Sequence, residues 1–196
     1  MQVVLATHNA HKVEELRRIL GDRLGEHELV GYDGPEPVED GDTFAANALI
    51  KARAAAEHTG LPAIADDSGI AVDALGGAPG IHSARYAGTR DDGDNLRLLL
   101  TNLAGIADRR AAFVCAAAFV LPGEGGTVEH VEESRWPGDV LEAAAGVGGF
   151  GYDPIFRPEG ETRSAAELTA DEKNAVSHRA QAFGALIGFV RSTLDA

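Results

Sequence analysis

The chain has 196 residues, 44% of them hydrophobic, and a formal net charge of −14, which predicts one sizeable globular domain, or two small lobes around one core, and excludes a disordered chain. We expect no binding to duplex nucleic acid, because phosphate contacts need clustered Lys and Arg, so any phosphate site must be a local basic pocket. The single Cys115 cannot form an internal disulfide, no stretch is apolar enough to span a membrane, and a strand starting at residue 2 leaves no room for a signal peptide, so we expect a cytoplasmic protein.

A predicted strand over residues 2–6 runs into a polar loop, THNAHK, and then into a helix that ends near Leu20. Such a strand-to-helix turn offers backbone N–H groups and a helix N-terminus to an anion, and Lys12 in the first turn would reach a phosphate. The loop contains no glycine, so it is neither a Walker P-loop nor a dinucleotide-binding motif. A plain helix cap by Asn9 or Thr7 is the alternative.

An acidic loop at residues 33–42 follows a second predicted strand, residues 28–32, and leads into a helix that Thr43 caps and Gly60 ends. Acidic residues before a helix complement its dipole, but they are also candidate metal ligands. These candidates are Glu39, Asp40 and Asp42. Inside the helix, Asn47 and Lys51 lie four residues apart and share one face.

The apolar run at residues 61–65 ends in Asp66 and Asp67, and Ser68-Gly69 predicts a turn before another strand at residues 70–75. Two adjacent acids at the mouth of a buried strand repel each other and lose solvation. A divalent cation would compensate them, since hard cations take oxygen ligands. A solvated Asp-rich turn is the alternative.

The middle of the chain continues with a glycine-rich connection (76–88), an amphipathic helix (91–103) and two hairpin arms (111–121 and 127–136) joined around Pro122-Gly123-Glu124-Gly125-Gly126. The segment GVGGFGYDPIF at 146–156 is too rich in glycine for a strand. Its Phe150, Tyr152 and Phe156 suggest either a flat apolar slot for a ring or a hairpin whose aromatics enter the core.

The C-terminal part is predicted to be helical. Lys173 could share a site with His178 and Arg179 only if the helix breaks, with Ser177 as the N-cap of a second helix. Lysine occurs only at positions 12, 51 and 173, which suggests a specific need for an ammonium there, with drift in an arginine-using chain as the alternative.

Six blocks, in this order, resemble the inosine triphosphate pyrophosphatase family, also called dITP/XTP pyrophosphatases. They are THNAHK, TFAANALIKA after the acidic loop, LPAIADDSG, GAPGIHSARYAG, GGFGYDP and EKNAVSHR. The blocks cover nearly the whole chain, and the ordered set is far more specific than any one of them.

The resemblance implies an elongated, two-lobed α/β fold in a single domain over residues 1–196, with a long mixed central sheet flanked by helices, an active-site cleft between the lobes and usually a homodimer. It also implies a Mg²⁺-dependent enzyme. Its substrates would be non-canonical purine nucleoside triphosphates (ITP, dITP and XTP), hydrolysed to monophosphate and pyrophosphate so that the nucleotide pool is cleansed.

Carried over by position, Glu39 and Asp67 would bind Mg²⁺, and the catalytic residues would be Asp67, which activates water, and Lys12. The substrate site would be lined by Thr7, His8, Asn9, Ala10, His11, Lys12, Lys51, Ser68, Phe150, Gly151, Tyr152, Asp153, Lys173, His178 and Arg179. His8 and His11 depart from the family pattern, because many relatives have smaller residues there. The extra carboxylates of the acidic loop make Glu39 less secure as a ligand than Asp67.

Two alternatives remain open. One is a Maf-like pyrophosphatase for modified nucleotides, whose pattern is not seen to match SHR and FGYD together. The other is a non-catalytic nucleotide-binding sensor. The pair Asp66-Asp67 speaks against a sensor, which needs no water-activating base.

Overall fold

The computed structural model of the protein describes residues 1–123 and 125–196, and at Asp22 the backbone alone. The strands are β1 (Gln2–Leu5), β2 (Glu28–Gly31), β3 (Ala63–Val72), β4 (Arg110–Leu121), β5 (Val128–Val140) and β6 (Phe156–Pro158). The α-helices are α1 (Ala10–Leu20), α2 (Phe44–Thr59), α3 (Asp92–Asn102), α4 (Ala170–Val176) and α5 (His178–Leu194). The short 3₁₀ helices are η1 (Gly21–Leu24), η2 (Asp73–Leu75), η3 (Gly80–Arg85), η4 (Asp153–Ile155) and η5 (Ala165–Glu167).

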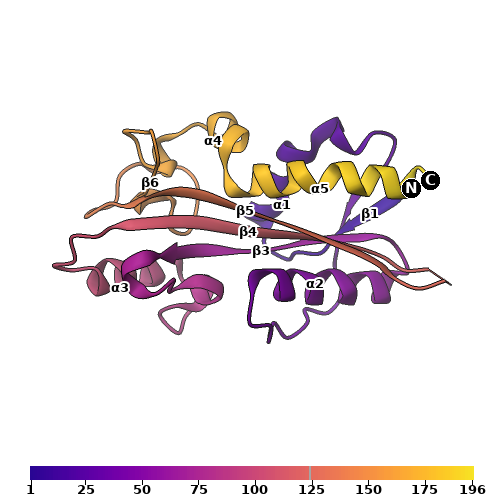
Figure 1. Cartoon of the computed structure of the whole chain (residues 1–196), viewed down its shortest axis with the longest axis horizontal. Helices are drawn as coiled ribbons and strands as arrows, with labels where there is room; N and C mark the ends of the chain where they lie inside the picture. The colour runs from indigo at the N-terminus through magenta and orange to yellow at the C-terminus, as the bar shows by residue number, and fades with distance from the viewer. Residues whose placement is uncertain (124) are drawn as a thin grey trace. The chain divides into compact units, whose positions relative to one another are not determined.

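The strands form one sheet in the order β2-β1-β3-β4-β5-β6. β1 pairs in parallel with β2 and with β3, whereas β5 pairs antiparallel with β6. Helices lie alongside the strands (Figure 1). The expected α/β fold with a mixed sheet flanked by helices is therefore confirmed.

The chain divides into two compact units. Unit 1 comprises Met1–Asp67, Cys115–Ser134 and Arg179–Ala196, and unit 2 comprises Ser68–Val114 and Arg135–His178. The division falls inside three strands, so each unit is assembled from segments that lie far apart in the sequence. The expectation of a single domain stays a prediction.

In unit 1 helices cover both faces of the sheet. Because successive residues of a strand point to opposite sides, their side chains enter two different cores. Leu5, Ile64 and Phe119 belong to a core with residues of α1 and α5. The intervening positions of the same strands belong to a second core with α2, in which alanines of the helix pack against alanines of the sheet. Such small side chains allow α2 to approach the sheet closely, and Figure 1 shows α2 across the sheet from α1 and α5.

Unit 2 has its own apolar core, which α3, the second half of β3 and the first half of β4 build together with Trp136, Tyr152 and Phe156. Phe113 is central among the aromatics, with its ring centroid 4.6 Å from that of Phe156 and 6.5 Å from that of Trp136. Unit 2 therefore buries Tyr152 and Phe156, two aromatic residues of the glycine-rich segment 146–156.

Most predicted helix boundaries are confirmed. Thr43 caps α2 by accepting a hydrogen bond from the backbone N–H of Ala46, and Gly60 ends the helix with a left-handed φ of 69°. Asp91 caps α3 in the same way, through the N–H of Asp94. The predicted break also occurs, since α4 ends at Val176 and α5 begins at His178. Both hairpin arms are strands, and the second continues to Val140; Glu124 lies outside the described residues.

The turn predicted at Ser68-Gly69 is wrong, because both residues lie inside the continuous strand β3. The glycine serves a close approach instead of a turn. A Cβ on Gly69 would lie 2.3 Å from Oγ of Ser83 and 2.4 Å from the carbonyl oxygen of Gly80. The strand predicted at residues 70–75 also ends earlier, at Val72, where η2 follows.

Candidate functional site

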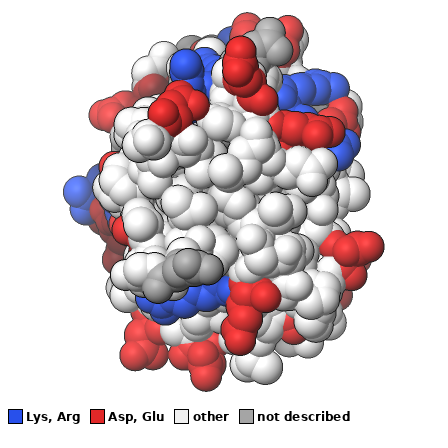
Figure 2. Space-filling model, turned by 90° about the vertical axis from the view of Figure 1, so that its right-hand side faces the viewer, with Lys and Arg blue, Asp and Glu red and all other residues white. Residues whose placement is uncertain are grey.

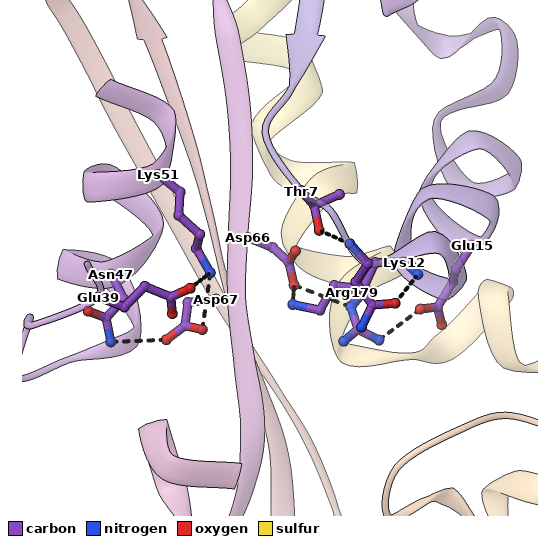
Figure 3. A network of polar contacts seen from close by, with 10 residues as sticks. Thr7, Lys12, Glu15, Glu39, Asn47, Lys51, Asp66, Asp67 and Arg179 are labelled. Atoms are coloured by element: carbon purple, nitrogen blue, oxygen red, sulfur yellow. Dashed lines mark hydrogen bonds and ion pairs between the residues drawn. The ribbon is translucent and has the colours of Figure 1, made fainter. Parts of the chain in front are cut away.

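Asp66 and Asp67 lie within β3 and point to opposite faces of the sheet (Figure 3). Asp66 shares the face of Ile64, which packs with α1 and α5, whereas Asp67 shares the face of Ala65, which packs with α2. The strand period of two thus separates two adjacent acids. One cation therefore does not compensate both acids, and a divalent cation beside Asp67 stays a prediction.

Asp66 is compensated by cationic side chains of the chain itself. Its Oδ2 lies 2.9 Å from Nζ of Lys12 and 3.3 Å from Nε of Arg179, and the side chain is fully buried. Burial alone raises the pKa of this carboxyl, but the charges of Lys12 and Arg179 outweigh burial and hold the pKa well below its usual range. Arg179 also donates from Nη1 to Oε2 of Glu15 at 2.7 Å. Asp66 is therefore a structural anion that orients two cations.

Asp67 has a different environment on the α2 face. Nζ of Lys51 lies 3.3 Å from its Oδ1, and Nδ2 of Asn47 donates to its Oδ2 at 3.3 Å. The same Lys51 ammonium lies 3.4 Å from Oε1 of Glu39 in the acidic loop. Burial lowers the pKa of Lys51, but the carboxylates, Asp67 first among them, outweigh burial, and the pKa is raised. The ammonium thus remains charged between two carboxylates.

This arrangement fits a hard divalent cation. Two carboxylates, Glu39 and Asp67, converge on one positive charge, and carboxylate oxygens are the ligands that Mg²⁺ prefers. Among the described residues no group of three or more His, Cys, Asp or Glu side chains is placed to hold a metal. Protein ligands of Mg²⁺ are commonly just one or two carboxylates, with water and phosphate completing the shell, so a pair is sufficient.

The polar loop before α1 is a helix cap as well as a candidate phosphate site. Asn9 caps α1 by accepting from the backbone N–H of Lys12 at 3.1 Å, and the hydroxyl of Thr7 accepts from the N–H of Asn9 at 3.2 Å. His8 reaches away from the helix, with Nε2 at 2.9 Å from the carbonyl oxygen of Gly34. Ala10 and His11 are exposed at the start of the helix.

In unit 2, Asp153 organises the loop of the GGFGYDP block. Its Oδ2 accepts from the backbone N–H of Phe150 at 2.9 Å and from Nζ of Lys173 at 2.7 Å. The Lys173 ammonium also lies 5.0 Å from the centre of the Phe150 ring, which is a cation–π contact. The backbone N–H of Gly151 donates to Oδ2 of Asp92 at the start of α3, at 2.9 Å. This loop is therefore held by side chains on both of its flanks.

The aromatic slot suggested by the sequence is reduced to Phe150. Tyr152 and Phe156 belong to the core of unit 2, and the Tyr152 hydroxyl donates to the carbonyl oxygen of Ser83 at 2.9 Å. Burial, with smaller effects of Tyr86 and Asp92, raises the pKa of the Tyr152 phenol. Phe150 remains partly exposed. The alternative in which the aromatics enter the core is thus correct for two of the three.

His178 lies buried in the aromatic core of unit 2. Its ring stacks almost parallel on Phe113, with 4.8 Å between centroids and 9° between planes, and Trp136 lies beyond at 6.3 Å. The stacking fixes the plane of the imidazole. Lys173 is also buried in this unit, whereas Arg179 contacts Asp66 and Glu15 in unit 1.

The candidate residues therefore form two groups, one in each unit. Unit 1 contains Thr7, His8, Asn9, Ala10, His11, Lys12, Glu39, Lys51, Asp67 and Arg179, and unit 2 contains Ser68, Phe150, Gly151, Tyr152, Asp153, Lys173 and His178. Sequence reasoning missed Glu15 and Asp92 and gave Asn47 no role. The signal for Glu15 was a carboxylate on the apolar side of α1, where it is almost fully buried.

The whole chain is similar to known proteins. The model of the Ham1 family matches residues 3–189. A dITP/XTP pyrophosphatase of Streptomyces coelicolor is 58% identical over 98% of both chains, and one of Leifsonia xyli is 57% identical over 98% of this chain and 96% of its own. A Coxiella burnetii HAM1 protein structure has a TM-score of 0.87 at 40% identity, covering 98% of this chain and 99% of that one. Among the described residues, no helix is long and apolar enough to cross a membrane.

Proposed function

This chain belongs to the Ham1 family, as the resemblance read from its sequence anticipated, and we propose on that basis that it hydrolyses the non-canonical purine nucleotides ITP, dITP and XTP to monophosphate and pyrophosphate. The proposal rests foremost on one arrangement, in which Asp67 and Glu39 converge on the Lys51 ammonium. The relatives that match this chain over nearly their full lengths are named dITP/XTP pyrophosphatases, and these names support the same substrate class.

We propose that Glu39 and Asp67 hold Mg²⁺. When bound, Mg²⁺ neutralises charge on the triphosphate and on the pyrophosphate that leaves. Lys51 then lies beside this site as a further positive charge for phosphate oxygens. The backbone of the loop before α1 and the Lys12 ammonium offer donors to the rest of the triphosphate, since a helix N-terminus favours an anion.

Asp67 is proposed as the general base. Its carboxylate takes a proton from a water molecule, and the water oxygen forms the new bond to the α-phosphorus. The anhydride bond between the α- and β-phosphates breaks, and pyrophosphate leaves. Asn47 and Lys51 hold the two oxygens of Asp67 in place, so the carboxylate is oriented before substrate binds. A positioned base of this kind accelerates a reaction by about 10²–10⁴-fold.

Within the unit 2 group, Phe150 and His178 are proposed to contact the nucleoside, whereas the Lys173 ammonium is proposed to bind phosphate. Phe150 offers the partly exposed aromatic face, and Lys173 and Asp153 fix the loop that carries it. His178 presents a ring whose plane is set by Phe113. Stacking on an aromatic ring suits any purine, so selection among purines must come from hydrogen bonds to the ring substituents.

A substrate panel tests the proposed function. The purified protein is incubated with dITP, ITP, XTP, dATP and dGTP, with MgCl₂ or with EDTA, and pyrophosphate and free phosphate are measured separately. We expect Mg²⁺-dependent pyrophosphate release from the first three nucleotides and far less from dATP and dGTP. Release of free phosphate, or nucleotide binding without hydrolysis, would overturn the proposal; the second result is the behaviour of a sensor.

We further propose a homodimer in a reducing, cytoplasmic environment. The resemblance to the family supports the dimer, and Figure 2 shows a broad patch without charged side chains, bordered by side chains of both signs. Buried Cys115 has a thiol whose pKa burial raises, which suits a permanently reduced cysteine. Light scattering after gel filtration tests the dimer, since a monomer has a mass of 20.4 kDa.

A further inference from the structure

Asn47 is a buried amide that uses both ends of its side chain. Its Oδ1 accepts a hydrogen bond from the backbone N–H of Gly41 at 2.8 Å, and its Nδ2 donates to Oδ2 of Asp67 at 3.3 Å. The residue is 1% exposed. One short side chain therefore contacts both the acidic loop and the proposed base.

On the β3 side, Asn47 determines how Asp67 is held. Each oxygen of the Asp67 carboxylate has a donor, Lys51 at Oδ1 and Asn47 at Oδ2. Both donors stand on α2, whose alanines pack closely against the sheet, but Lys51 has a long and flexible stem whereas Asn47 has two side-chain torsions. Asn47 is thus the more rigid of the two donors.

On the loop side, Asn47 determines where the end of the acidic loop lies. Gly41 is two residues beyond Glu39, and it approaches α2 so closely that a Cβ would lie 2.8 Å from Oδ1 of Asn47 and 2.8 Å from Cβ of Ala46. Residues 33–42 contain no helix or strand, so this contact substitutes for regular structure. It holds the chain just after Glu39.

Helix capping does not explain this asparagine. Thr43 already caps α2 through the N–H of Ala46. Asparagine is a poor residue inside a helix, because its amide competes with the helix for backbone partners. Its presence in the buried first turns of α2 is explained by the two partners that its amide connects.

We propose that Asn47 is a positioning residue that fixes Asp67 and, through the same amide, the loop that carries Glu39, so that both carboxylates are presented together to one divalent cation. The inference rests on the proposed function for the identity of that site. Residues that orient metal-binding carboxylates typically contribute about 10–100-fold in metal affinity or activity.

Three variants test the role of Asn47, with Mn²⁺ as the probe. Asn47→Leu keeps the volume and removes both hydrogen bonds. Gly41→Ala leaves Asn47 intact but forces the loop away from it. Asn95→Leu is the matched control, because Asn95 is equally buried and also connects a loop to a helix, yet its partners among the described residues are the backbone groups of Ala84 and Ala87. Mn²⁺ binding is measured by electron paramagnetic resonance, and thermal unfolding and the Mg²⁺ concentration for half-maximal activity are measured beside it.

We expect Asn47→Leu to weaken Mn²⁺ binding by about 10–100-fold, and Gly41→Ala to weaken it in the same direction. Asn95→Leu should lower the unfolding temperature but leave Mn²⁺ binding unchanged. Parent-like Mn²⁺ binding in both test variants, an equal loss in the control, or no binding by the parent would overturn the inference. If the parent binds Mn²⁺ and the variants respond as expected, but no pyrophosphate is released, the proposed function alone has failed.

Discussion

Lys12 and Arg179 place their cationic groups on the same atom, Oδ2 of Asp66, at 2.9 and 3.3 Å. Lys12 comes from α1 and Arg179 from α5, so the buried carboxylate connects the two helices that cover one face of the sheet in unit 1. Arg179 also pairs with the buried carboxylate of Glu15, so the two cations and two carboxylates of this cluster balance in charge.

The ionisation of Asp66 predicts how stability depends on acid. In the unfolded chain an aspartate has a pKa of about 3.9, and in the folded protein the pKa is lower. Between these values the unfolded state binds the proton more readily, so acidification favours unfolding. The stability that ionised Asp66 contributes is therefore present above about pH 4 and is lost as the pH falls through the folded pKa.

Asp66→Asn should destabilise the protein at pH 7 by up to about 3–5 kcal/mol, because two cations lose a buried partner. The difference from the parent should shrink below about pH 4, where the parent loses the contribution of the charge. Urea unfolding at a series of pH values measures both free energies. A difference that stays constant from pH 7 to pH 3 would show that the charge of Asp66 contributes nothing.

Asp67→Asn should reduce turnover with dITP by about 10²–10⁴-fold, since the amide keeps the shape of the side chain but cannot take a proton. Asp108→Asn is the control, because Asp108 is an exposed aspartate whose carboxylate pairs with Arg110. The measurement is pyrophosphate release at saturating Mg²⁺. Near-parental turnover of the Asp67 variant would remove Asp67 from the role of base.

Local rules predicted the helices well, because caps such as Thr43 and Gly60 are short-range signals. Gly69 was misread, since a glycine that permits the approach of Ser83 looks the same in sequence as one that makes a turn. Because β3 continues through these residues without a turn, Asp66 and Asp67 point to opposite faces of the sheet. Their partners, Arg179 and Lys51 among them, come from distant segments and could be placed only by resemblance.

Lys12 and Lys173 are predicted to bind the phosphates of the substrate. Replacing either lysine with Met, which keeps an apolar stem, should weaken binding of dITP far more than binding of deoxyinosine, because only the nucleotide carries the charges that an ammonium neutralises. Calorimetric titration of both ligands, in EDTA to prevent hydrolysis, measures the two losses. Equal losses for nucleoside and nucleotide would show that the lysines serve only their ion pairs with Asp66 and Asp153.

Phe150 is predicted to stack on the purine. Phe150→Leu should raise the KM for dITP by about 5–150-fold, as expected for the loss of about 1–3 kcal/mol of stacking. Val147→Ala is a fitting control, because Val147 is fully exposed on the same segment. If both variants keep the parental KM, the purine does not contact this ring.

Arg179 is predicted to read the 6-position of the base. Hypoxanthine and xanthine present a carbonyl there, which a guanidinium satisfies by donating, whereas adenine presents an amino group that also donates. A buried donor facing another donor can discriminate by about 10⁴–10⁵-fold. Arg179→Ala removes one charged hydrogen bond of such a site, so it should lower the ratio of kcat/KM for ITP over ATP by about 10–100-fold. Arg53→Ala, which removes an exposed arginine paired with Glu129, should leave the ratio unchanged. Should the Arg179 variant lose activity on ITP yet keep the full preference over ATP, Arg179 holds the substrate and does not read the base.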